Sequence, residues 1–219
     1  GNSWNYSFYV PQDVNGVKIF MGGDKRFIER LDSLFTMDLP AKYYEKTEDI
    51  TQEGLMGNYG HGNEPSQHIP YLYMWTSQPW KTQYRLREIM DRMYRNNIDG
   101  LCGNDDCGQM SAWYIFSAMG FYPVNPISGE YVLGAPLFQK VTLNLPNNKV
   151  FVIDARNNND KNLYIDSAKS NGKKFTRNYL THDEISSGGE LSLKMNAKPN
   201  MKRGVRPEDF PYSYSVYKP

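Results

Sequence analysis

The chain contains 219 residues, of which 39% are hydrophobic and 22% are charged, and its formal net charge at pH 7 is +1. A nearly neutral chain argues against nucleic acid or a charged membrane surface as the main partner, because both require a basic patch. No apolar run approaches the ~20 residues of a membrane-spanning helix, and the first residues show no recognisable signal peptide. The length fits one large domain, or one domain with a smaller companion.

Aromatic residues are unusually frequent, with 17 Tyr, 10 Phe and 4 Trp. Such rings mostly build hydrophobic cores, but carbohydrate-binding clefts also use them as flat platforms against the apolar faces of sugars. The composition therefore leaves both a large aromatic core and a sugar-binding surface open.

The amino-terminal half is predicted to consist of helices separated by long loops. Residues 1–12 carry an aromatic side chain at nearly every second position, which predicts an extended or irregular start. Asp13 is expected to cap a short helix that reaches residue 21 and turns Phe20 inward. After two glycines, Asp24 is expected to cap a second helix to about residue 35, with apolar residues at helical spacing.

A long glycine-rich segment follows these helices. Residues 36–65 are rich in Gly, Asn and Glu, and a loop of this length inside a compact domain is more often functional than idle. Three further helical segments are predicted at residues 65–75, 81–94 and 109–119. The last of these is apolar nearly all round, so it should be buried.

From Gly120 onward the pattern changes to short alternating runs between turn residues, which predicts strands up to about residue 194. Asn171-Gly172 is a strong signal for a two-residue hairpin, and residues 188–189 indicate another turn. Residues 198–219 look irregular. The expected fold class is α+β, with a helical region at 1–124 and a β-rich region at 125–219.

Three loops hold the candidate chemistry. The first is the aromatic amino-terminal segment that contains Trp4. The second contains Asn63 and Glu64, whose side chains offer the hard oxygen ligands that Ca²⁺ prefers. The third places Asp105 and Asp106 side by side between glycines, just before a helix. Nothing about folding requires two adjacent carboxylates there, so the third loop points to chemistry.

Plainer readings of the same residues remain open. Glu64 could interact only with the start of its helix, and either aspartate could serve as a turn residue or an N-cap. His61 alone is more often structural than a ligand. A disulfide across so tight a loop is uncertain, so Cys102 and Cys107 are expected to be free thiols.

Three motifs resemble glycoside hydrolase family 92. They are Gly-Asn-Asp-Asp-Cys-Gly-Gln-Met-Ser-Ala-Trp-Tyr at 103–114, Gly-Asn-Glu-Pro-Ser at 62–66, and Gly-Asn-Ser-Trp-Asn-Tyr followed by Val-Pro-Gln-Asp-Val within 1–14. The tail is also similar to that family at 131–138, 171–173, 182–185 and 188–191. The family contains calcium-dependent, inverting exo-α-mannosidases and is common in gut Bacteroidetes. The resemblance spans residue 1 to about residue 200.

The resemblance implies a larger architecture than this chain provides. Family members have an N-terminal β-sandwich, then an (α/α)₆ toroid, then further β-structure. With only about five helices, the chain is expected to be a C-terminal fragment: the last part of the toroid and a β-sandwich-like tail. Its partner would be the missing N-terminal part of the same enzyme, and the location would be secreted, periplasmic or on the outer surface of a bacterium. The family's general acid is a Glu immediately before the motif at 1–4, so the chain is expected to lack it.

The resemblance also implies roles for the three loops. Asp106 is expected to be the general base, with Asp105 as its partner or substitute. Ca²⁺ would be held by Asn63 and Glu64, with Asp106 as a third contributor, and would bind two hydroxyls of mannose. The substrate would be a mannose-containing glycan. The sugar pocket is expected to be lined by Trp4, His61 and Gln109.

Two other readings stay open at this point. The chain could be a carbohydrate-binding module whose Tyr and Trp side chains contact sugars without catalysis. It could also be an unrelated structural α+β domain, in which case the glycine-rich loops would be disordered and no Ca²⁺ would bind.

Overall fold

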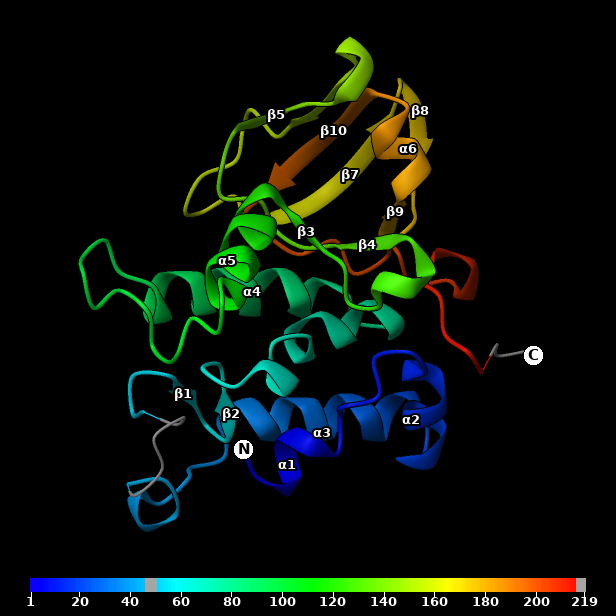
Figure 1. Cartoon of the computed structure of the whole chain (residues 1–219). Helices are drawn as coiled ribbons and strands as arrows, with labels where there is room; N and C mark the ends of the chain where they lie inside the picture. Colours follow the sequence, from blue (N-terminus) through cyan, green and yellow to red (C-terminus); the bar gives the residue numbers. More distant parts are fainter. Residues whose placement is uncertain (46–50, 216–219) are drawn as a thin grey trace.

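The computed structural model describes residues 1–45 and 51–215. Helices form its lower and middle layers and a sheet forms the layer above them (Figure 1). Two expected segments reach beyond the described residues, because 46–50 belong to the long loop and 216–219 to the irregular tail. Within the described part of the chain, no helix has the length and apolar character needed to cross a membrane.

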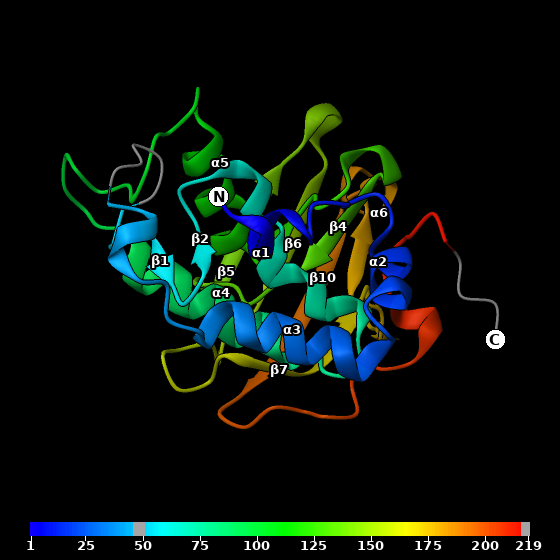
Figure 2. The same ribbon diagram turned by 90° about the horizontal axis from the view of Figure 1, so that it is seen from below.

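The helical layers contain two long amphipathic helices. In α3 (Asp24–Thr36) the buried side chains recur at helical spacing, as the sequence predicts, and the same holds for α4 (Trp80–Met93). Seen from below, α3 runs across the near face of the molecule, and α4 lies deeper (Figure 2). The remaining elements of this half are short: α1 (Ser3–Tyr6), α2 (Val14–Phe20), β1 (Leu55–Met56), β2 (Tyr59–Gly60), α5 (Gln109–Met119), and 3₁₀ turns at Ala41–Tyr43, Glu64–Ser66 and Ile69–Trp75.

The described residues of the second half form two sheets. The larger has the strand order β5-β6-β10-β7-β8, with β6 and β10 parallel and the other neighbours antiparallel. The smaller is antiparallel with the order β3-β4-β9. Their elements are β3 (Phe121–Tyr122), β4 (Glu130–Leu133), β5 (Lys140–Asn144), β6 (Val150–Asp154), β7 (Tyr164–Ser170), β8 (Lys173–Phe175), β9 (Tyr179–Thr181), α6 (His182–Ser186), β10 (Gly189–Asn196), and 3₁₀ turns at Pro126–Ser128, Pro146–Asn148 and Pro207–Asp209.

Two hydrophobic cores meet at α5 and β4. Trp113 of α5 is fully buried in the helical core, whereas Phe116 of the same helix packs against the core of the sheets. Adjacent residues of β4 are divided in the same way, with Val132 in the first core and Leu133 in the second. This position between two cores explains why α5 is apolar nearly all round, although Ile115 is exposed.

Several predicted details of the fold are confirmed. The carboxylate of Asp13 caps α2 by accepting a hydrogen bond from the Gly16 amide at 3.0 Å. The Asn171-Gly172 pair joins β7 to β8 with φ angles of 48° and 78°, as a two-residue hairpin turn requires. Both cysteines are free thiols. An α+β fold is observed, while membership of a toroid and a domain boundary at residue 124 stay predictions.

Of the two alternatives for residues 1–12, the irregular start is observed, because the Asn2 side chain accepts hydrogen bonds from the amides of Trp4 and Asn5 and thereby starts α1. Two predicted details are wrong. Phe20 is 94% exposed rather than turned inward. Asp24 does not cap α3; the N-cap is Gly23, and the Asp24 carboxylate accepts from Ser77 instead, at 2.6 Å from its hydroxyl.

Candidate functional site

The side chain of Asn5 joins the first and second candidate loops. Asn5 lies in α1 and is 2% exposed. Its Nδ2 donates to the carbonyl of Asn58 at 2.8 Å and to Oδ1 of Asn2 at 3.1 Å. Its Oδ1 accepts from the Gly60 amide at 3.3 Å and from the Ser66 hydroxyl at 3.0 Å. The amino-terminal segment is therefore held against both ends of the loop that contains Asn63 and Glu64.

The second and third loops touch through glycines. A Cβ added to Gly103 would lie 2.7 Å from the Cα and 3.0 Å from the carbonyl oxygen of Gly62. Only a glycine allows two backbones to approach this closely. The loop of Asp105 and Asp106 thus starts in direct contact with the residue before Asn63, and the three candidate loops meet in one region.

The two adjacent aspartates have different surroundings. Oδ1 of Asp105 accepts from the backbone amide and the hydroxyl of Ser111 at 3.0 and 2.9 Å, which caps the first turn of α5. Gly108, the formal N-cap, has no side chain that could do so. Asp106 is exposed, and its φ of 45° begins a run of left-handed residues that continues through Cys107 at 60° and Gly108 at 96°. Left-handed non-glycine residues cost free energy and gather at functional sites.

His61 lies behind the loops rather than at their surface. The ring is 0% exposed, and its Nδ1 and Nε2 are each 2.7 Å from a tyrosine hydroxyl, of Tyr59 and Tyr94 respectively. Trp113 packs edge-on against it with ring centres 4.3 Å apart. Burial lowers the pKa of His61 to about 3, so the ring is neutral at physiological pH. Contact between His61 and a sugar stays a prediction, and in this structure both ring nitrogens already have partners.

Gln109 and Trp4, the other two residues expected at the sugar pocket, are only partly buried. Gln109 is the first residue of α5, and its amide nitrogen donates to Gln67 at 2.9 Å and to the Tyr122 hydroxyl at 3.1 Å. Trp4 lines a cavity of about 510 Å³ with Gly1 and Tyr43, among others. The cavity brings an indole and an exposed phenol ring together beside the start of the chain.

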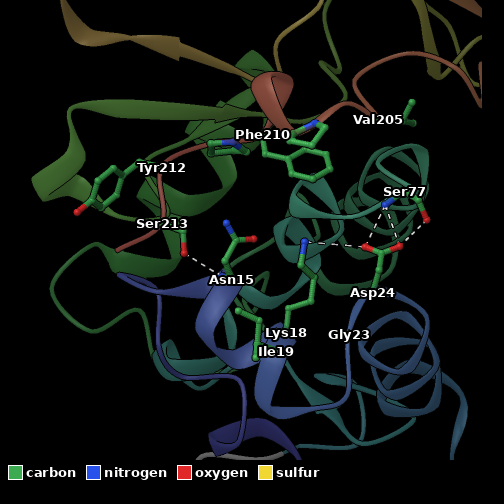
Figure 3. A pocket seen from close by; sticks show the side chains of 12 residues that line it. Asn15, Lys18, Ile19, Gly23, Asp24, Ser77, Val205, Phe210, Tyr212 and Ser213 are labelled. Carbon is green, nitrogen blue, oxygen red and sulfur yellow. Dashed lines mark hydrogen bonds and ion pairs between the residues drawn. The ribbon is translucent and has the colours of Figure 1, made fainter. Parts of the chain in front are cut away.

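A second cavity, of about 490 Å³, lies between α2 and the C-terminal segment (Figure 3). Lys18 enters it, with Nζ 4.0 Å from Asp24 and 5.1 Å from the centre of the Phe210 ring. Of the described residues that line this cavity, none belongs to the three candidate loops. It is therefore separate from the predicted site.

The residues of the second loop fit a hard cation. Oδ1 of Asn63 is buried and has no hydrogen-bond partner among the described residues. An amide oxygen left in this state costs about 1–3 kcal/mol, and a cation that accepts it as a ligand would offset that cost. The side chain of Glu64 is next to it in sequence and partly buried. An amide oxygen beside a carboxylate is the kind of donor set that suits Ca²⁺.

Carboxylates alone would not complete such a shell. Within residues 1–45 and 51–215, no group of three or more His, Cys, Asp or Glu side chains is arranged to hold a metal ion. A cation at Asn63 would need backbone carbonyls, amides or water as further ligands, all of which Ca²⁺ accepts. The contribution of Asp106 to this shell stays a prediction.

Sequence reasoning missed the residues that connect the loops. Asn5, Gln67 and Ser111 are polar residues without a distinctive spacing, and their role appears only when distant segments meet. The carbonyl of Gln67, for example, accepts from the indole of Trp113 at 2.9 Å, which ties the second loop to α5. The Asn-x-x-Asn spacing around α1 was the one available signal, since asparagine favours N-caps.

Comparisons with known proteins identify the family. The chain matches the glycosyl hydrolase family 92 catalytic domain over residues 1–197. It is 45% identical to a family GH92 α-mannosidase of Bacteroides thetaiotaomicron, with a TM-score of 0.88 over 99% of this chain and 27% of that one. A family GH92 inverting mannosidase of Bacteroides thetaiotaomicron VPI-5482 is 49% identical, with a TM-score of 0.86 over 98% of this chain and 30% of that one.

A curated relative adds a more distant match. An uncharacterized secreted glycosidase of Arthroderma benhamiae is 30% identical over 213 residues, which is 96% of this chain and 25% of that protein. The chain thus spans between 25% and 30% of the length of these relatives. Because the family match covers nearly the whole chain and includes all three loops, the chain belongs to glycosyl hydrolase family 92.

Proposed function

We propose that this chain supplies the base side and the cation site of an inverting, Ca²⁺-assisted α-mannosidase that acts on terminal α-mannosides of glycans. The observation that carries the proposal is the meeting of the three family motifs in one region, through Asn5 and through the Gly62–Gly103 contact. The structures similar to this chain are of an α-mannosidase and of an inverting mannosidase, which supports the choice of substrate and stereochemistry.

Asp106 is the proposed general base. An inverting glycosidase needs a carboxylate that takes a proton from the attacking water on the face opposite the leaving group. The exposed Asp106 is open to water, whereas Oδ1 of Asp105 already accepts two hydrogen bonds from Ser111. This difference favours Asp106 as the base and gives Asp105 the part of a supporting residue.

The proposed general acid is a glutamate that precedes the motif at residues 1–4 in a longer polypeptide. A Cβ built on Gly1 would lie 3.7 Å from Oδ1 of Asn63, so Gly1, to which such a glutamate would be joined, lies beside the second loop. Acid and base of an inverting enzyme are about 6.5–9.5 Å apart, which leaves room for the water. The second loop, which Gly1 approaches at Asn63, also contacts the third loop through Gly62 and Gly103.

Asn63 and Glu64 would hold the cation, with Asp106 as a further ligand. When bound there, Ca²⁺ would engage the 2- and 3-hydroxyls of mannose and favour a distorted ring. The polypeptide's own groups would do the rest: Trp4 and Gln109 would orient the sugar, and His61 would fix the loop from behind through Tyr59 and Tyr94.

The proposed architecture follows the relatives. The helices would be the last part of an (α/α)₆ toroid, and the sheets its β-sandwich-like tail, within a polypeptide about as long as the relatives. That polypeptide would act outside the cytoplasm, as the name of the secreted relative suggests. The present chain alone, without the acid and most of the cleft wall, is expected to have no turnover.

The test is proton NMR of an aryl α-mannoside incubated with the full polypeptide that contains this chain. The proposal expects β-mannose as the first product, loss of turnover with a chelator and its return with Ca²⁺. Release of α-mannose first would contradict inversion, and binding of mannosides without hydrolysis would favour a non-catalytic carbohydrate-binding protein. Turnover by residues 1–219 alone would contradict the need for an upstream acid.

A further inference from the structure

The geometry points to Asn5 as the positioning residue of the candidate site. We propose that its side chain fixes the loop of Asn63 and Glu64 in register with the amino-terminal segment, and so presents Oδ1 of Asn63 to a cation. The inference rests on the proposed function for the identity of that cation. Its geometric part stands on the hydrogen bonds of Asn5 alone.

The amide of Asn5 uses its full hydrogen-bonding capacity. A primary amide has two N–H donors and two lone pairs on its oxygen, and Asn5 has two acceptors and two donors around it. The side chain is 2% exposed, so water cannot replace a lost partner cheaply. An amide that is buried and fully paired allows one arrangement of the segments around it.

The four partners of Asn5 bracket the cation loop. Asn58 and Gly60 precede His61, and Ser66 follows Glu64. Asn5 therefore holds the loop by hydrogen bonds on both sides of the two proposed ligands. The remaining partner, Asn2, lies in the segment that begins at Gly1. One side chain therefore sets the distance between the start of the chain and the loop.

The network reaches farther through Asn58. Its own side chain accepts from Asn2 at 3.1 Å and donates to the carbonyl of Met37 at 3.0 Å, at the end of α3. The backbone amide of Asn58 donates to Leu34 in the same helix at 2.7 Å. The loop is thus anchored to a long, well-packed helix, and a rigid anchor is what the precise placement of a ligand requires.

The contrast within the loop supports a ligand role for Asn63. The side-chain amides of Asn5 and Asn58 make the hydrogen bonds described above. Oδ1 of Asn63, in contrast, is buried without a hydrogen-bond partner among the described residues. A network that satisfies the surrounding amides and leaves one oxygen open holds that oxygen ready for a cation. Groups that orient a metal ligand in this way typically change metal affinity by about 10- to 100-fold when they are removed.

The experiment compares Asn5→Asp with Asn178→Asp in the full polypeptide. Both replacements keep the volume and remove two N–H donors from a buried side chain. Asn178 is a matched control because its Nδ2 donates to the carbonyls of Met74 and Gly204 at 2.9 and 2.7 Å, far from the three loops in sequence and in contacts. Calorimetry gives the Ca²⁺ affinity, hydrogen–deuterium exchange reports on residues 58–67, and thermal unfolding gives the stability of each variant.

We expect Asn5→Asp to weaken Ca²⁺ binding about 10- to 100-fold and to speed exchange across residues 58–67. Asn178→Asp, whose new carboxylate would face the buried Arg203 guanidinium, should leave both readouts as in the wild type. Unchanged exchange at 58–67 in Asn5→Asp would overturn the inference, as would an affinity loss of equal size in the control. If the wild type binds no Ca²⁺, the cation part of the proposed function fails, and the exchange comparison still decides whether Asn5 positions the loop.

Discussion

Asp105 and Asp106 are neighbours in the chain, yet the structure separates their roles. The Asp105 carboxylate closes the first turn of α5 through Ser111, and the left-handed backbone at Asp106 turns the next carboxylate outward. From the residues alone, either aspartate could have been the turn residue or the N-cap, and only the family resemblance favoured Asp106 as the base. The difference comes from Gly108, because an N-cap without a side chain leaves capping to a residue farther upstream.

Replacing Asp105 by Ala should destabilise the protein by about 1 kcal/mol, the usual cost of losing a helix cap. The free energy of unfolding in urea would show this loss. Asp106→Asn is the matched control, since asparagine also tolerates a left-handed backbone and Asp106 is exposed. Equal destabilisation by the two replacements would contradict the capping role of Asp105.

Stability should fall as the pH falls from 7 to 5, because two buried histidines resist protonation. Burial lowers the pKa of His61 to about 3 and that of His68 to about 4, below the usual 6.5. In this window the unfolded rings bind protons and the folded rings do not, so the unfolded state gains stability. Each ring should cost about 2 kcal/mol between pH 7 and pH 5.

The variant His68→Gln isolates this effect. Urea unfolding of wild type and variant at pH 7 and pH 5 gives the free energy of unfolding at each pH. Between pH 7 and pH 5 the variant should lose less of it than the wild type, and the difference should equal the contribution of one histidine ring. Nε2 of His68 lies 2.8 Å from the carbonyl of Phe8, and the glutamine amide can donate there without titrating. Identical pH profiles for the two proteins would mean that His68 takes up a proton in the folded state.

At the scale of elements, the sequence predicted the helices and turns that depend on interactions between residues close together in the chain. The bounds of α3 and α4 nearly follow from apolar periodicity, those of α5 follow from a nearly continuous apolar run after Gly108, and the hairpin at Asn171-Gly172 follows from turn chemistry. The parallel pairing of β6 with β10 could not be predicted, since it joins strands separated by β7, β8 and β9. The small β1–β2 hairpin inside the long loop was missed because each strand has only two residues.

The contact between the second and third loops makes a prediction about glycine. Gly103→Ala should destabilise the protein by about 1–3 kcal/mol, because the new Cβ would meet the backbone of Gly62 at 2.7 Å and backbone cannot move aside. It should also weaken Ca²⁺ binding by displacing the second loop.

The control for this replacement is Gly60→Ala in β2. A Cβ on Gly60 would meet only the Leu55 side chain, at an ordinary 3.8 Å. Unfolding free energies of the two variants should therefore differ clearly. If Gly103→Ala is as stable as Gly60→Ala, the two loops do not touch as described.

At the scale of the whole molecule, the site depends on contacts between segments far apart in the sequence. The motifs at 1–14, 62–66 and 103–114 could each be recognised in the sequence, and their convergence could only be inferred from the family. In the structure, Asn5 joins the first two motifs, and the contact between Gly62 and Gly103 joins the last two. Polar contacts between distant segments produce no periodic pattern in the sequence, so they could not be predicted from it.

The helical layers and the sheets also act as one support for the third loop. The helix that follows Asp105 and Asp106 is anchored in the helical core by Trp113 and against the sheets by Phe116. The carboxylates are therefore held from both sides of the molecule. The family match likewise runs through the helices and into the sheets, to residue 197.

The most direct test of the account is the turnover of an α-mannoside by Asp106→Asn and Asp105→Asn in the full polypeptide. Loss of a general base costs about 10²–10⁴-fold in rate, so Asp106→Asn should lose that much in kcat while it stays folded. Asp105→Asn should keep most of the wild-type turnover, because asparagine also caps a helix. Turnover of Asp106→Asn close to that of the wild type, or a larger loss in Asp105→Asn, would contradict the assignment of Asp106 as the base.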